Sequence, residues 1–168
     1  MKYLLILCLF ASSAAMSQSK SVTAFHEKYQ GDRDATVISL KGSIFNLVAN
    51  IAAEADEADE ELQAIARIAD DINSIKVLTI PVYKSGLEPA EIKALHKDLL
   101  KENYDELMTV RDGSDRIYFL AQGDESEVRN MMVLIQEDSD FTLLSVDGRL
   151  SMADLSVLAR NHRNLDLD

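Results

Sequence analysis

The sequence predicts a two-layer α+β protein, in which N-terminal helices and βα units are followed by a four-stranded antiparallel meander and a C-terminal helix. Apolar residues at helical spacing dominate the first half of the chain, which predicts helices there. In the second half, short strand-like runs alternate with tight polar turns, which is typical of a meander. Neither a repeat nor a linker interrupts this order, so we expect a single domain over residues 18–168.

The N-terminal residues 1–17 have the pattern of a secretory signal peptide. Lys2 supplies a positive charge, an apolar run follows, and small residues precede the expected cleavage between Ser17 and Gln18. The apolar run is shorter than the roughly 20 residues that a spanning helix requires, so we expect no integral membrane span. We therefore expect export, either to the periplasm or to the extracellular medium.

Cys8 is the only cysteine and lies inside this leader. A lipoprotein anchor needs small residues directly before its cysteine, whereas Leu7 is bulky, so lipoprotein anchoring is not expected. A mature chain without cysteine would have no disulfides, no thiolate metal site and no cysteine nucleophile.

The first elements expected in the mature chain are a short helix and a strand. Val22, Phe25 and Tyr29 lie at helical spacing, and the β-branched stretch 35–40 is typical of a strand. From Ile44 to Ile72, apolar and small residues then alternate in steps of four and three, which resembles a heptad stripe.

The acidic stretch EADEADEEL interrupts this stripe. Acidic side chains favour the first turn of a helix, so we prefer two helices, about 43–54 and 58–72. A single helix of about 29 residues is the alternative. Further on, residues 74–83 form the strongest strand pattern, Pro89 is expected to begin a helix, and Ser151 is expected to cap the last helix.

The composition limits the classes of partner. The chain has 29 acidic against 17 basic residues and a formal net charge of -12, which repels phosphate backbones, so no nucleic acid partner is expected. His26, His96 and His162 lie on separate segments without the spacing of a metal site, and common nucleophile and phosphate-loop motifs are absent. We therefore expect no catalytic residue and no cofactor.

The acidic run is the most prominent polar cluster in the sequence. Calcium takes about six to eight oxygen ligands, and an acidic segment between two helices could supply several of them. The other interpretation is a solvated helix N-terminus, which the same residues favour electrostatically. The candidate metal ligands are Glu54, Asp56, Asp59 and Glu60.

Two Asp-Gly turns with neighbouring arginines form the second candidate site. Turn chemistry alone accounts for the Asp-Gly pairs, because glycine takes positive φ and aspartate caps the turn. If the two turns meet at one end of a sheet, they would form an interaction patch. Its members would be Arg111, Asp115, Arg116 and Arg149.

Several segments, among them GSIFNLV, IADDINSIKVLTI and MMVLIQED, together resemble the domain of unknown function family 4252. The most specific part is YDELMTVRDG, followed about thirty residues later by the strand that ends in VDGRLS. Members of this family are small exported or lipid-anchored envelope proteins of Gram-negative bacteria. The resemblance implies export, an α+β fold and a non-enzymatic role in the envelope, beside extracytoplasmic sigma-factor systems. It brings no catalytic residue.

We therefore expect an exported, non-enzymatic protein that binds another envelope protein in a role accessory to envelope signalling. One alternative is a calcium-binding protein that uses the acidic segment 54–61. Another is a hydrolase built from scattered carboxylates. The identity of the partner and the oligomeric state do not follow from the sequence.

Overall fold

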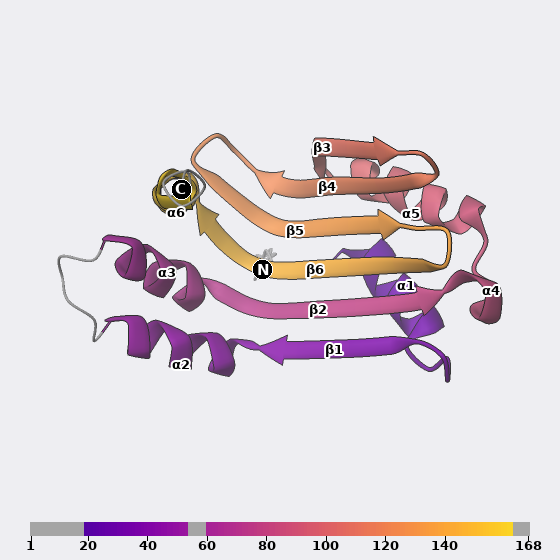
Figure 1. Ribbon diagram of the computed structural model, residues 1–168, viewed down its shortest axis with the longest axis horizontal. Coiled ribbons are helices and arrows are strands. Elements are labelled where there is room, and N and C mark those ends of the chain that lie inside the picture. The colour runs from indigo at the N-terminus through magenta and orange to yellow at the C-terminus, as the bar shows by residue number, and fades with distance from the viewer. Residues whose placement is uncertain (1–18, 54–59, 163–168) are drawn as a thin grey trace, which may run out of the picture.

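The computed structural model describes residues 19–53 and 60–162, which form helices and one antiparallel sheet (Figure 1). The elements in chain order are α1 (Lys20–Tyr29), β1 (Thr36–Lys41), α2 (Gly42–Ala53), α3 (Glu60–Asp70), β2 (Ile72–Pro81), α4 (Val82–Ser85), α5 (Pro89–Lys101), β3 (Asp105–Asp112), β4 (Asp115–Gly123), β5 (Glu127–Gln136), β6 (Asp140–Ser151) and α6 (Met152–His162).

The sheet has six strands in the order β1-β2-β6-β5-β4-β3. The expected four-stranded meander is present as β3 to β6, but the sheet is larger and has six strands, because β2 pairs with β6 and β1 pairs with β2. Both extra strands are antiparallel to their neighbours, so they do not form a parallel βα unit. The pairing of β2 joins residues as distant as Thr79 and Thr142, 63 positions apart, and such a pairing leaves no mark in the local sequence pattern.

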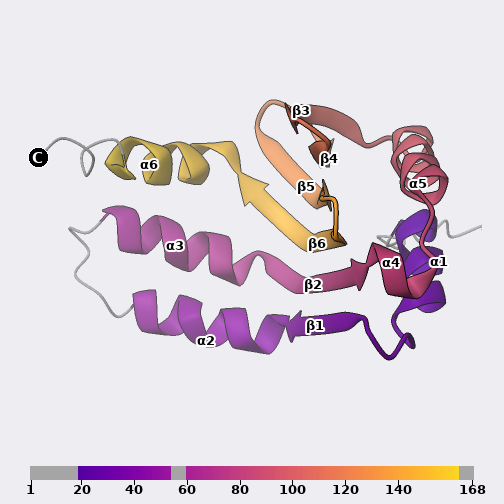
Figure 2. The ribbon, with the colours of Figure 1, turned by 45° about the vertical axis from the view of Figure 1, so that its right-hand side comes forward.

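A pair of helices, α2 and α3, connects β1 to β2. These strands are antiparallel neighbours, so the chain reverses direction between them, and the two helices lie side by side beyond the end of the sheet (Figures 1 and 2). The preferred prediction of two helices is confirmed, and the single long helix is wrong. Small buried side chains on α3, such as Ala64 and Ala69, permit close helix packing, and Arg67 forms a 2.6 Å ion pair with Asp154 of α6.

Helices α1 and α5 cover one face of the sheet and lie behind the strands in Figure 1. Glu91 of α5 accepts a 2.7 Å hydrogen bond from the Tyr29 hydroxyl of α1. Ser21 of α1 donates a 2.6 Å hydrogen bond to Glu102, the residue directly after α5. These polar contacts hold α1 against the C-terminal and N-terminal parts of α5. The main core lies between these helices and the strands. It contains Val22, Phe25, Leu78, Ile80, Ile92, Leu95, Leu99, Leu120, Leu134, Phe141 and Leu143.

The opposite face of the sheet has no helix in front of it in Figure 1. Directly paired residues of neighbouring strands share a face, so the register defines rows of side chains across the sheet. One such row on this open face is apolar over all six strands. Its members are Ile38, Val77, Leu144, Val133, Phe119 and Met108.

Helix α2 adds a second apolar surface outside the core. Leu47 and Ile51 keep 61% and 65% of their surface exposed, and Ile44 and Val48 are exposed as well. An apolar helix face that the rest of the chain leaves uncovered is a feature of binding surfaces.

Candidate functional site

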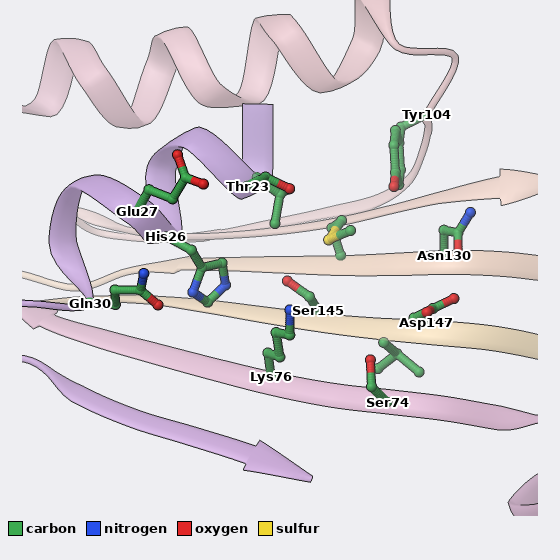
Figure 3. Close-up of a pocket in the computed structure, with 13 residues that line it drawn as sticks. Thr23, His26, Glu27, Gln30, Ser74, Lys76, Tyr104, Asn130, Ser145 and Asp147 are labelled. Carbon is green, nitrogen blue, oxygen red and sulfur yellow. The ribbon is translucent and has the colours of Figure 1, made fainter. Parts of the chain in front are cut away.

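A cavity of about 210 Å³ lies between α1 and strands β2, β5 and β6 (Figure 3). Figure 3 shows the His26 ring directed from α1 toward the strands, with Lys76 and Ser145 below it on β2 and β6. Asp147 and Asn130 lie farther along the same wall. We refer to this space as the His26 cavity.

The cavity lies where the helix-covered face of the sheet changes from apolar to polar. Under α1, the inward positions of β6 carry Phe141 and Leu143, both fully buried. The next inward position is Ser145, and Lys76 of β2 lies directly opposite it in the register. Side chains alternate between the two faces of a sheet along each strand. The Ser145 hydroxyl and the Lys76 ammonium group therefore lie on the same face as the core side chains.

Two buried polar atoms at this cavity have no hydrogen-bond partner among the described residues. They are Nε2 of His26 and Oγ of Ser145, and both residues are only 8% exposed. A buried polar group without a partner costs about 1–3 kcal/mol, so such groups are rare in folded proteins and mark places where a water molecule or a ligand is held. The two atoms come from different layers and meet at one cavity.

The electrostatics of the cavity favour a neutral histidine beside a cation. Burial lowers the pKa of His26 below its usual 6.5, and the charge of Lys76 lowers it further. The ring is therefore neutral at pH 7, with one nitrogen donating and the other accepting. Burial also raises the pKa of Tyr104 to about 12, with smaller contributions from Glu102 and Asp147, so the Tyr104 phenol stays protonated.

This arrangement can bind an acceptor group. The Lys76 ammonium, the Ser145 hydroxyl and one His26 tautomer are donors on adjoining walls, which suits a carboxylate. Within the described part of the chain, neither Nε2 of His26 nor Oγ of Ser145 has a hydrogen-bond partner, so no hydrogen bond joins these two atoms. A serine nucleophile would need its hydroxyl hydrogen-bonded to a base.

Comparison with known proteins places the chain in a family. The model of the family described as Domain of unknown function (DUF4252) matches residues 29–158. The protein belongs to the DUF4252 family. The suspected membership is thus confirmed. No curated protein and no solved structure matches the chain.

The arginine patch expected from the sequence is divided in this DUF4252 protein. Arg111 and Arg116 lie opposite each other on β3 and β4, and Asp115 lies beside Arg116 at the start of β4. Arg149 lies on β6 opposite Arg129 of β5. Arg129 pairs with Gln122, which lies at the opposite end of β4 from Arg116. The structure thus brings Arg111, Asp115 and Arg116 together, but not Arg149.

The calcium candidates Glu54, Asp56 and Asp59 lie outside the described residues, as do Ser17 and Gln18 at the expected cleavage site. Glu60 begins α3. Within residues 19–53 and 60–162, no group of three or more histidine, aspartate or glutamate side chains is arranged to hold a metal ion. No helix in those ranges is long and apolar enough to cross a membrane.

Sequence reasoning did not find the His26 cavity. His26 appeared only as an isolated histidine, and Lys76 and Ser145 as polar positions within strands. A usable signal exists in the strand FTLLSVDG, where Ser145 continues the alternating series of Phe141 and Leu143 with a polar side chain. The cavity itself depends on how α1 packs on β6, which local patterns do not contain.

Proposed function

We propose that this DUF4252 protein is an exported, non-enzymatic binding protein of the bacterial envelope that holds a small carboxylate-bearing molecule in the His26 cavity. One observation carries the proposal. His26 and Ser145 are more than nine-tenths buried, and Nε2 of His26 and Oγ of Ser145 have no hydrogen-bond partner among the described residues. Both residues line a cavity that Lys76 also lines. A bound carboxylate would satisfy all three groups.

Titration with a panel of short-chain carboxylates and free amino acids tests this proposal, with the His26 ring resonances followed by NMR. At least one acid is expected to shift them saturably. The variant Ser145→Leu fills part of the cavity and should abolish the shift. Thr142→Val, on the same strand but facing the other side of the sheet, should retain it. If no acid moves the His26 signals, or if Ser145→Leu responds like the wild type, the proposal is wrong.

Export is tested separately by fractionating cells that produce the full chain with a C-terminal tag. The leader pattern predicts an envelope product whose mass corresponds to a chain beginning at Gln18. A full-length product confined to the cytoplasm would contradict this part of the proposal.

A different observation favours a second function, which is docking of another envelope protein. The large side chains of α2, above all Leu47 and Ile51, face away from the rest of the chain, and the open face of the sheet is apolar. A photo-crosslinking residue at position 47 should form a discrete adduct in intact cells, whereas the exposed position Glu125 should form none. An adduct of exactly two copies of this chain, or no adduct at position 47, would count against a distinct partner.

A further inference from the structure

A second cavity, of about 310 Å³, lies between α5 and strand β4. Its basic lining residues are Lys93, Lys97, His96 and Arg116, and none of the described aspartates or glutamates lines it. The chain has 29 acidic and only 17 basic residues, so a cavity lined by basic residues alone among its charged groups is unusual for this composition. We refer to it as the Arg116 groove.

Arg116 is a half-buried residue of this groove. Its Nε atom is shielded from solvent and has no hydrogen-bond partner among the described residues. Arg111 of β3 lies directly opposite, and like charges at such positions in a sheet destabilise it. Neither arginine forms an ion pair with a described acidic side chain.

The nearest titratable neighbours are already held in place. The His96 ring contacts the Tyr118 ring with 4.4 Å between centroids, and His96 Nε2 lies 2.8 Å from Glu106 Oε2. Glu106 also accepts a hydrogen bond from Thr109. The Glu106 carboxylate is therefore bound to His96 and Thr109. The contact between the His96 and Tyr118 rings holds these two lining residues of the groove in place.

Lys93 and Lys97 form the opposite wall. They are four positions apart on α5, so they lie on one face of the helix about one turn apart. Both side chains are exposed and neither is paired with a described carboxylate. Two exposed lysines and Arg116 therefore line one cavity of about 310 Å³.

We propose that the Arg116 groove binds a small multivalent oxyanion of the phosphate class. The guanidinium fork of Arg116 binds two oxygens of such an anion, and Lys93 and Lys97 neutralise the remaining charge. The anion also relieves the repulsion between Arg111 and Arg116. A free solute fits better than an anionic lipid surface, because the net charge of -12 opposes approach to such a surface.

Thermal unfolding and calorimetry with inorganic phosphate test the groove, with chloride at equal ionic strength as the monovalent comparison. Phosphate is expected to raise the melting temperature saturably, because a ligand that binds only the native state stabilises it. Chloride should have no such effect. The variant Arg116→Gln should weaken phosphate binding about tenfold or more, since it removes charge-assisted hydrogen bonds.

Arg149→Gln is the matched control, because Arg149 also lies opposite an arginine of the neighbouring strand but does not line the groove. It should bind phosphate like the wild type. If Arg116→Gln does not fold, the double variant Lys93→Gln with Lys97→Gln, on the exposed side of α5, should show the same loss. The inference is overturned if phosphate and chloride act alike, or if Arg149→Gln loses as much affinity as the groove variants. Ser145→Leu, which blocks the His26 cavity, should leave phosphate binding unchanged, so the two sites are tested independently.

Discussion

Replacing Ser145 with alanine should make the ligand-free protein more stable. The Ser145 hydroxyl is buried without a hydrogen-bond partner, and leaving such a group unpaired costs about 1–3 kcal/mol. Alanine removes that cost and leaves the β-carbon in place, so only the contacts of one oxygen atom are lost. We expect Ser145→Ala to raise the free energy of unfolding by about 1 kcal/mol.

Thr142→Val is the matched control for this substitution, because it removes a hydroxyl from the same strand. Thr142 Oγ1 lies 3.0 Å from Thr79 Oγ1 on the open face of the sheet, so valine breaks a formed hydrogen bond. This variant should lower the free energy of unfolding by about 1 kcal/mol. The two substitutions delete the same chemical group and should act in opposite directions.

Urea unfolding curves, with the wild-type slope as reference, measure both changes. If Ser145→Ala is destabilised to the same extent as Thr142→Val, the Ser145 hydroxyl is satisfied in the free protein. The physical argument for a ligand in the His26 cavity would then fail.

Three further substitutions test other parts of the structure. Burial lowers the pKa of His26 below 6.5 in the folded state, so the unfolded chain takes up the proton first as the pH falls. Wild-type stability should be full above about pH 6.5 and decrease as the pH falls below that value, and His26→Gln should flatten this part of the stability profile. Glu91→Gln weakens the capping of α5 and the bond from Tyr29, and should lower the free energy of unfolding by about 1 kcal/mol in a denaturant titration. Gly148→Ala would place a β-carbon 2.5 Å from the Asp71 carbonyl oxygen, so it should lower the melting temperature and reduce the free energy of unfolding by about 1–3 kcal/mol. An unchanged melting temperature would contradict the close contact.

The elements that the sequence predicted well are those whose signals are local. Pro89 begins α5 as expected, and Ser151 accepts a 3.5 Å hydrogen bond from the Asp154 amide at the start of α6. The strands of the meander follow from short turns such as the one at Gly113, whose φ of 57° favours glycine. These features depend on residues within a few positions of one another.

The position of β2 in the sheet did not follow from the sequence, because its partner β6 lies far away along the chain. The His26 cavity was missed for the same reason. His26, Lys76 and Ser145 come from three separate elements, and only the packing of α1 on the sheet brings them together. Arg111 and Arg116, in contrast, lie opposite each other because one tight turn joins their strands, and this placement depends only on residues near them in the sequence.

The most direct test of the proposed binding function is native mass spectrometry of the protein isolated gently from the cell envelope. The wild type should carry a small bound acid, and Thr142→Val should carry the same species. Ser145→Leu should be free of it, because leucine occupies the space beside His26 and Lys76. A wild-type protein that carries no small molecule, or a Ser145→Leu variant that carries the same one, would contradict the assignment of the His26 cavity as a binding site.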